Sequence, residues 1–215
     1  MKPPKKMDTL PTQFYEQPTA IVARELIGKT LVRRHQNRWL GGIIVETEAY
    51  LGCNDLASHS HRGITTANGA MFEAAGTIYV YPIHNHYCFN VVTEHSGVGC
   101  AVLIRAVEPI WGMSEMMTRR RINHSRQLMR GPGCLCQALD INRTHNKQTL
   151  KKNRTFRIAE NPDVQPTITS TKRIGISRDK NLPLRYIWDG NWYVSGRASD
   201  HQTKPTRPPQ PTTHP

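Results

Sequence analysis

The chain has 215 residues, and 29 Lys and Arg residues against 16 Asp and Glu residues give a formal net charge of +13 at pH 7. A hydrophobic fraction of 37% at this length is enough to form one ordinary core, which excludes a wholly disordered chain. The sequence has no run of about 18 apolar residues, and its basic start lacks the apolar stretch of a secretory signal, so we expect a soluble intracellular protein.

The two ends differ in composition from the rest of the chain. Residues 1–9 combine three lysines with two prolines and predict a basic, disordered N-terminus. Residues 199–215 are rich in Pro and Thr with almost no apolar side chains, which predicts a disordered tail. One folded domain is therefore expected over residues 10–198.

The first half of this domain reads mainly as sheet. An amphipathic helix is predicted over Pro18–Ile27, with Gly28 as its stop. A hairpin follows, because the turn-like HQNR separates two runs rich in apolar and β-branched residues. The strands predicted in this half are Thr30–Arg34, Leu40–Tyr50, Gly76–Ile83, Tyr87–Val92 and Gly99–Val107.

Helical patterns return in the second half, over Trp111–Arg121 and Cys134–Ile141. Short extended segments are predicted at Lys172–Ile176, Leu184–Trp188 and Trp192–Val194, the last two joined by an Asp-Gly turn. Because a run of strands is flanked by helices without strict alternation, the expected class is α+β, a single compact domain.

The positive charge is concentrated in one tract. Between Arg119 and Arg157 there are eleven basic residues and one acid, a net charge of 11 − 1 = +10. Such a field is typical of a protein that binds a polyanion, and we favour nucleic acid over an anionic membrane. A solvated basic face without a partner is the alternative. The candidates for phosphate contacts are Arg119, Arg120, Arg130 and Arg143.

Strand alternation places Glu46, Glu48 and Tyr50 on one face of the second predicted strand. A carboxylate buried beside another is suited to general base chemistry, whereas an exposed strand end is the plain alternative. His59, and Tyr79 with Tyr81, follow nearby in sequence and could hold a planar group between their rings.

Metal chemistry has little support in the sequence. The pairs His59/His61, His84/His86 and Cys134/Cys136 are each separated by one residue, and paired zinc cysteines are usually separated by two or more. The five cysteines are an odd number in a chain of this length, and we interpret them as free thiols.

Several segments, in collinear order, resemble the alkyladenine (3-methyladenine) DNA glycosylase family: VETEAYLG, MFEAAGTIYVY, CFNVV, VLIRAVEP, GPGCLCQALDIN and PLRYIWDGNWYVS. The resemblance implies an α+β domain around a curved antiparallel sheet and no metal or organic cofactor. It also implies binding of double-stranded DNA and monofunctional hydrolysis of the N-glycosidic bond of damaged purines in base excision repair, without lyase activity.

The same resemblance implies roles for individual residues. Glu48 would be the general base that activates water, and Arg105 and the backbone carbonyl of Ile174 would help to hold that water. Tyr50, His59 and Tyr81 would form the walls around the extruded base, and Asn90 would discriminate between bases at the pocket floor. Glu46 would be a supporting residue.

The chain departs from the family in two places. The family usually has a Tyr that enters the gap left by the extruded nucleotide, and here His84 is the positional candidate for this intercalating role. Where the family commonly has arginines, the chain reads Thr65–Asn68. A noncatalytic DNA-binding or lesion-sensing protein, or an RNA-binding module, therefore stays an alternative. We expect a monomer, located in a bacterial cytoplasm or nucleoid or in a nucleus.

Overall fold

The structure is a computed structural model that describes residues 8–208. Its α-helices are α1 (Thr12–Tyr15), α2 (Thr19–Glu25), α3 (Met113–Arg120) and α4 (Pro132–Ala138). Its strands are β1 (Thr30–His35), β2 (Arg38–Leu51), β3 (Ile78–Ile83), β4 (His86–Thr93), β5 (Cys100–Trp111), β6 (Phe156–Ala159), β7 (Ile168–Thr171) and β8 (Arg185–Trp188). The predicted α+β class is confirmed.

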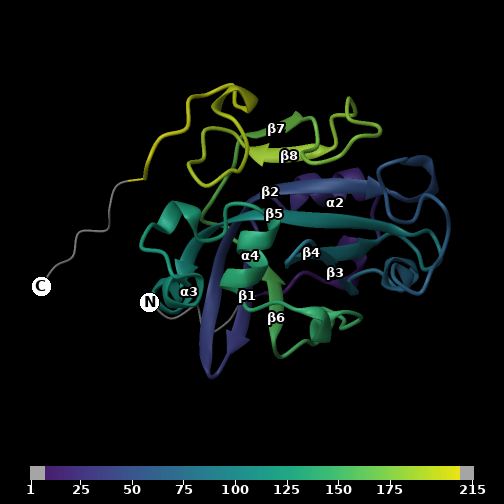
Figure 1. Ribbon diagram of the computed structural model, residues 1–215, viewed down its shortest axis with the longest axis horizontal. Coiled ribbons are helices and arrows are strands. Elements are labelled where there is room, and N and C mark those ends of the chain that lie inside the picture. The colour runs from purple at the N-terminus through teal and green to yellow at the C-terminus, as the bar shows by residue number, and fades with distance from the viewer. Residues whose placement is uncertain (1–7, 209–215) are drawn as a thin grey trace, which may run out of the picture.

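The strands of the described residues form one antiparallel sheet in the order β3-β4-β5-β2-β1-β6. The two long strands β2 and β5 cross its centre side by side (Figure 1). Strand β2 is long enough to change partner along its length. Its first part pairs with β1, and its last part pairs with β8, which in turn pairs with β7. The C-terminal part of β2 is therefore enclosed by β5 on one side and β8 on the other.

The predicted hairpin is confirmed, and its turn is made by Gln36 and Asn37, both with positive φ. Asn is among the residues that adopt this conformation most readily. Further along β2, Gly41 has a φ of +142°, and a Cβ there would stand only 2.1 Å from the carbonyl oxygen of Leu31 on β1. The close approach of β1 and β2 thus depends on a residue without a side chain.

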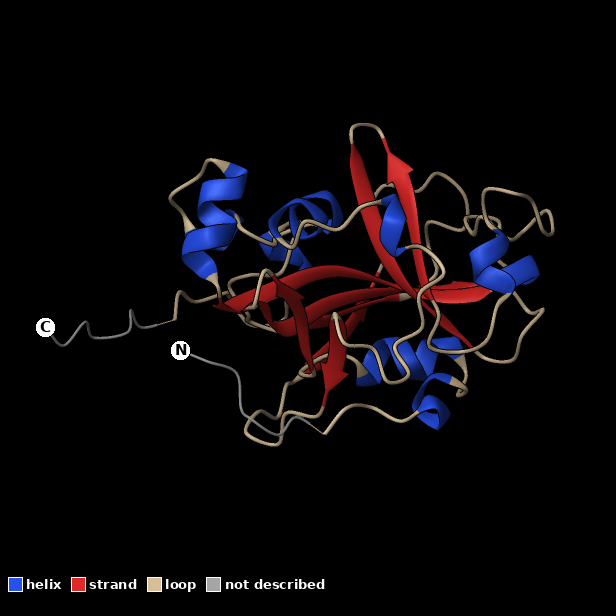
Figure 2. Ribbon diagram, turned by 90° about the horizontal axis from the view of Figure 1, so that it is seen from below, coloured by secondary structure: helices blue, strands red, loops and turns tan. Residues whose placement is uncertain are grey.

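Helices lie on both sides of the sheet (Figure 2). Helix α2 packs on β2 and β5, and α4 packs on β4 and β5. The buried interior includes Phe89 of β4 and Phe156 of β6, whose ring centroids are 5.4 Å apart. Among the described residues, no helix is long and apolar enough to cross a membrane.

Two predicted extended segments are wrong. Residues 172–176 form a loop after β7, because the Ile174 amide donates its hydrogen bond to a carboxylate instead of to a neighbouring strand. Residues 192–194 form a turn, because the Asn191 side chain and carbonyl accept from the amides of Tyr193 and Val194. The sequence also gave no indication of α1, β6 and β7, whereas the other predicted helices and strands are present with shifted ends.

Parts of both predicted disordered ends lie on the domain. The Leu10 amide donates to the Ile158 carbonyl of β6 at 2.9 Å, directly after an isolated bridge at Thr9. In the C-terminal segment, the amides of Gln202 and Thr203 donate to the Asp189 carboxylate at 2.8 and 2.9 Å. Residues 1–7 and 209–215, the rest of the two predicted ends, lie outside the described residues.

Candidate active site

The predicted sharing of a face by Glu46, Glu48 and Tyr50 is confirmed by their contacts. Both glutamates are bound by Arg105 of β5, whose Nε donates to Glu46 at 3.1 Å and whose Nη1 donates to Glu48 at 3.3 Å. The Tyr50 hydroxyl donates to Glu48 at 2.9 Å. Both carboxylates have 0% exposed surface, so the alternative of an exposed strand end is wrong.

Glu46 accepts four hydrogen bonds from the protein. Its Oε1 accepts from Arg105, from the Arg185 Nε at 2.6 Å and from the Ser195 hydroxyl, and its Oε2 accepts from the Ser195 amide. Burial raises the pKa of Glu46, but the charges of Arg105 and Arg185 outweigh burial and hold the pKa below its usual value. Glu46 is therefore an ionised carboxylate held by two arginines and a serine.

Glu48 accepts three hydrogen bonds from the protein, one fewer than Glu46. Its Oε2 accepts from Tyr50 and Arg105, and its Oε1 accepts from the Ile174 amide at 2.7 Å. The charges of Glu48 and Glu46 raise the pKa of Arg105 despite its burial, so the guanidinium keeps its proton beside both carboxylates.

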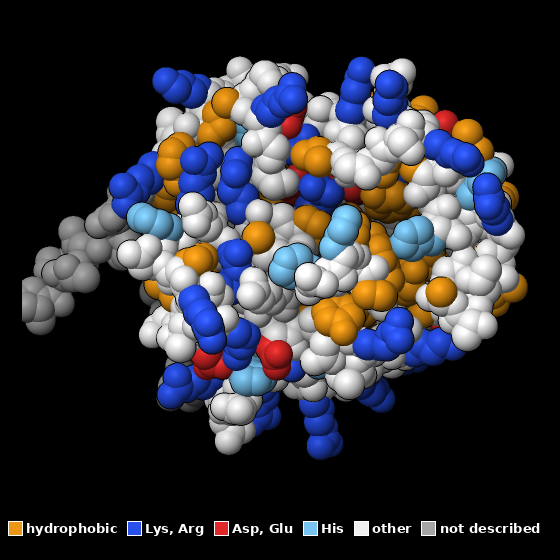
Figure 3. Space-filling model, viewed as in Figure 1, with side chains coloured by type: hydrophobic (Ala, Val, Ile, Leu, Met, Phe, Trp, Pro, Cys, Tyr) orange, Lys and Arg blue, Asp and Glu red, His pale blue; other side chains and the backbone are white. Residues whose placement is uncertain are grey.

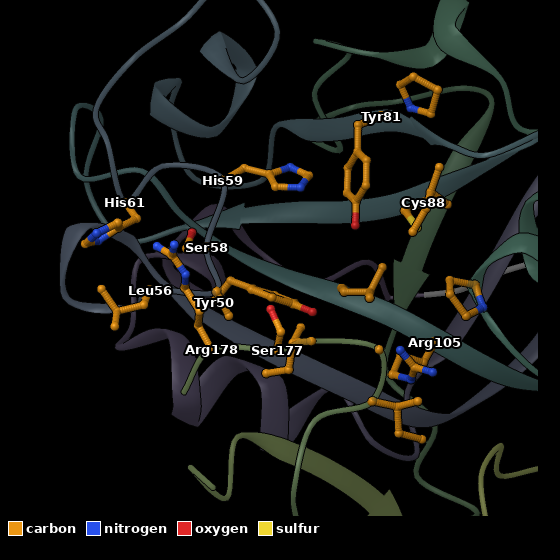
Figure 4. A pocket seen from close by; sticks show the side chains of 18 of the residues that line it. Tyr50, Leu56, Ser58, His59, His61, Tyr81, Cys88, Arg105, Ser177 and Arg178 are labelled. Carbon is orange, nitrogen blue, oxygen red and sulfur yellow. The ribbon is translucent and has the colours of Figure 1, made fainter. Parts of the chain in front are cut away.

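A cavity of about 790 Å³ opens beside this carboxylate, within the range of small-molecule sites. Tyr50, Arg105 and Ile174, the three residues that bind Glu48, all form part of its wall. Figure 4 shows Tyr50 and Tyr81 on different sides of the cavity, with Arg105 towards one end. The hollow lies in the middle of the face shown in Figure 3, with hydrophobic and His side chains around it.

Aromatic rings gather along one side of the cavity. The ring centroid of His59 is 4.4 Å from that of Tyr81, and Tyr81 is 5.3 Å from Tyr79. The Tyr79 hydroxyl lies 2.9 Å from His59 Nδ1 and fixes the orientation of the imidazole. Burial lowers the pKa of His59 and raises the pKa of both tyrosines, so all three rings are neutral near pH 7.

Comparison with known sequences decides the family. Residues 13–192 match the methylpurine-DNA glycosylase family. The chain belongs to this family. It is 45% identical over 200 residues to a protein of Rhodopirellula baltica, covering 90% of this chain and 86% of the relative. A relative from Methanoculleus marisnigri is 45% identical over 193 residues, which cover 88% of this chain and 100% of that relative. Both carry the name "Putative 3-methyladenine DNA glycosylase".

In this methylpurine-DNA glycosylase family member, Asn90 lies at the inner end of the ring cluster. Its side-chain amide donates to the Tyr79 carbonyl at 3.0 Å. Together with Met71 and Ala101 it lines a small recess that shares Tyr50, His59 and Tyr81 with the larger cavity. The recess measures about 20 Å³, which is room for about one water-sized group.

His84 occupies the exposed tip of the β3–β4 hairpin. Ile83 pairs with His86, so His84 and Asn85 form a two-residue turn, and His84 has a φ of +51°. The sequence reasoning missed Ile83, which is 42% exposed and lines the cavity mouth beside Pro82. Its position next to the predicted intercalating residue was the signal for it.

Three of the four arginines predicted to contact phosphate bind the protein itself. Arg119 donates to the Ala138 carbonyl and to Glu115, and Arg120 donates to the carbonyls of Gln127 and Leu128. Arg130 donates to the carbonyls of Val194 and Gly196. Arg143 is exposed in a short 3-10 turn. Much of the basic tract thus connects helices and loops, which charge counting could not reveal.

The structure adds a contact of Ile174 and an ion pair behind it. The amide of Ile174 donates to Glu48, and the role that the resemblance implies for its carbonyl stays a prediction. The preceding Arg173 forms a bidentate pair with Asp55, and both side chains have 0% exposed surface. Sequence reasoning missed this pair because 118 residues separate its members. No group of three or more potential metal-binding side chains occurs in residues 8–208.

Proposed function

We propose that this chain extrudes damaged purines from duplex DNA and hydrolyses their N-glycosidic bond, leaving an abasic site. The proposed substrates are 3-methyladenine, 7-methylguanine, hypoxanthine and ethenoadenine. Membership of the methylpurine-DNA glycosylase family and the names of the relatives support this proposal. The single observation that carries the mechanism is that all three residues that donate to Glu48 line the cavity.

The three residues that donate to Glu48 all line the cavity, whereas Arg185 and Ser195, which donate to Glu46, do not. Glu48 Oε1 accepts one hydrogen bond from the protein, from the Ile174 amide. In the proposed mechanism the attacking water donates to this oxygen. The bond between the purine nitrogen and the sugar C1′ breaks, and its electron pair leaves with the base. The water oxygen bonds to C1′, and its proton passes to Glu48. The anionic carboxylate also stabilises the oxocarbenium-like transition state, as carboxylates do in glycoside hydrolysis.

The residues around the cavity support hydrolysis by water over attack by an amine. No lysine is among the described residues that line the cavity. A glycosylase with lyase activity needs an amine that can form a Schiff base with the sugar. Arg105 remains protonated and serves as a fixed positive charge that orients Glu48. We therefore propose a monofunctional enzyme.

We propose that the uncharged aromatic rings around the cavity bind the alkylated base. A purine alkylated on a ring nitrogen carries positive charge and is attracted to the faces of Tyr50 and Tyr81, by about 0.5–2 kcal/mol. A protonated His59 would repel such a base, but its pKa is lowered by burial and it stays neutral near pH 7. Asn90 and its small recess would then discriminate between bases by the substituent that each directs inward.

Extrusion of the base needs a group to occupy the gap in the duplex. The exposed His84 and Ile83 at the tip of the β3–β4 hairpin are the proposed intercalating pair. An apolar side chain inserted at a base step is a common way to kink and unstack DNA. Unstacking costs a few kcal/mol, and less for damaged or mispaired bases, which favours lesions over intact pairs.

The test is single-turnover base release by wild type and Glu48→Gln. Duplexes carry either one hypoxanthine or alkylated purines, and abasic sites are read as strand breaks after alkali. Glu73→Gln is the matched control, because Glu73 is an exposed glutamate whose partner Lys147 is also exposed. We expect release by wild type and the control, and at least a hundredfold slower release by Glu48→Gln, the scale of a lost general base.

The proposal fails if wild type releases no base while it is folded and bound to the lesion duplex. That result would favour the noncatalytic lesion-binding alternative. Equal release by wild type and Glu48→Gln would retain the activity but remove Glu48 from the mechanism.

A further inference from the structure

Two arginines at the mouth of the cavity have no part in the mechanism above. Arg62 and Arg178 both line the cavity, and both are exposed. Within residues 8–208, neither guanidinium has a hydrogen bond or an ion pair with another side chain or carbonyl. They contrast with Arg119, Arg120 and Arg130, whose donors are taken by the protein.

The loop that carries Arg178 is fixed in place next to the loop that carries Arg62. The Asp179 carboxylate accepts from the Leu56 amide at 2.7 Å, which connects the two loops. Within the loop that carries Arg178, the Leu182 amide donates to the Asp179 carbonyl. At the start of this loop, the Ile174 amide donates to Glu48. The two loops that carry the arginines are therefore held next to each other and to Glu48.

Figure 4 shows Arg178 between Tyr50 and Leu56, with its guanidinium directed towards the loop that carries Ser58 and His61. Figure 3 shows further Lys and Arg side chains around the edge of this face. Among the residues that the structure describes, those that line the cavity include three arginines and no Asp or Glu. Of these three arginines, only Arg105 is neutralised by the buried glutamates.

This charge does not suit the base. A neutral purine gains little from an exposed guanidinium, and a cationic alkylated purine is repelled by it. The other part of an extruded nucleotide that reaches the mouth of the cavity is its backbone, with a negative charge on each phosphate. Arginine suits phosphate because its planar fork can donate two parallel hydrogen bonds to two oxygens.

We propose that Arg62 and Arg178 bind the backbone phosphates that flank the extruded nucleotide and so hold it in the cavity. This inference rests on the proposed function, because it requires the nucleotide to leave the duplex. It also supplies phosphate-binding groups where other expected ones are missing. Basic residues are absent from Thr65–Asn68, and three arginines of the basic tract are bound internally.

The experiment compares Arg62→Ala, Arg178→Ala and Arg178→Lys with wild type. Lys180→Ala is the matched control, because it removes one exposed charge from the same loop at a side chain that does not line the cavity. Dissociation constants are measured between 50 and 200 mM NaCl on two duplexes. One duplex is intact, and the other carries a tetrahydrofuran abasic-site analogue, which needs no catalysis. Single-turnover base release from hypoxanthine DNA is measured at saturating enzyme.

Each alanine variant is expected to bind the analogue duplex about tenfold more weakly, as for loss of a charge-assisted hydrogen bond. Its log–log salt slope should fall by about 0.9, the value for one phosphate contact. Arg178→Lys should keep the slope but regain only part of the affinity, because lysine lacks the fork. Base release at saturation should also slow, because the extruded state is less populated.

The inference is overturned if both alanine variants match Lys180→Ala in affinity and slope on the analogue duplex. It is also overturned if they weaken binding to intact and analogue duplexes equally, because general attraction to DNA would then explain the charge. Failure of the proposed function has a different signature, which is the absence of base release by wild type. The binding measurements still report on the two arginines in that case.

Discussion

Replacing Asp55 by Asn tests how the loop behind Glu48 is held. Asp55 accepts two hydrogen bonds from Arg173 and one each from the amides of Leu51 and Ala57. Arg173 also donates to the Ala49 carbonyl at 2.9 Å, and its guanidinium lies over the Tyr50 ring at 4.8 Å. The pair thus connects the start of the loop after β7 to the end of β2.

The expected cost follows from the groups left without partners. Asparagine has one acceptor oxygen in place of two and carries no charge, so about two charge-assisted hydrogen bonds are lost. At about 1.5–3 kcal/mol for each such bond, the loss agrees with the ~3–5 kcal/mol for removing one partner of a buried ion pair. We expect Asp55→Asn to lower the free energy of unfolding by about 3–5 kcal/mol.

The assay is equilibrium urea unfolding followed by tryptophan fluorescence, with the exposed Asp163→Asn as control. Base release is measured in parallel, because Ile174 follows Arg173 and donates to Glu48. We expect slower release by the folded variant. A loss of stability below about 1 kcal/mol, the upper range for surface pairs, would refute the reasoning.

The dependence of the free energy of unfolding on pH below neutrality gives a second test of the Asp55–Arg173 pair. Burial raises the pKa of Asp55, but the hydrogen bonds and charge of Arg173 lower it below the usual value overall. A carboxyl group with a lowered folded pKa contributes stability above its unfolded pKa, about 3.9, and loses it as pH falls through the folded pKa. Wild type should therefore lose stability below about pH 4 more steeply than Asp55→Asn. Parallel pH profiles of the two proteins would contradict this assignment.

Three further substitutions test the rest of the site and the sheet. Glu46→Gln leaves buried arginines without their carboxylate, so it should cost about 3–5 kcal/mol and slow base release, and a wild-type melting temperature would contradict this. Tyr79→Phe removes the hydroxyl 2.9 Å from His59 Nδ1, with an expected loss of about 1 kcal/mol and weaker lesion binding in titrations. Unchanged lesion affinity would show that His59 needs no such support. Gly41→Ala places a Cβ 2.1 Å from a carbonyl oxygen of β1, so we expect little soluble folded protein in expression trials. Normal yield and stability would refute the close approach.

The sequence alone determined the features that depend on neighbours along the chain. Alternation of side chains in VETEAY placed Glu46, Glu48 and Tyr50 on one face, because that periodicity is a property of any extended strand. Apolar patterning predicted β1 to β5 and β8, and the turn-like HQNR predicted the first hairpin, because turn residues act locally. Collinear motifs indicated the family.

Tertiary structure alone decided which groups meet across the chain. Arg105 bridges the two glutamates, and the amide of Ile174 reaches Glu48 across 126 residues of sequence. Ser195 and Arg185 donate to Glu46, whereas the residues that donate to Glu48 line the cavity. The same long-range contacts bind Arg119 inside the domain, while Arg178 remains at the cavity mouth. No local pattern encodes these differences, because two arginines of equal charge differ only in which carbonyls and carboxylates the fold brings within reach.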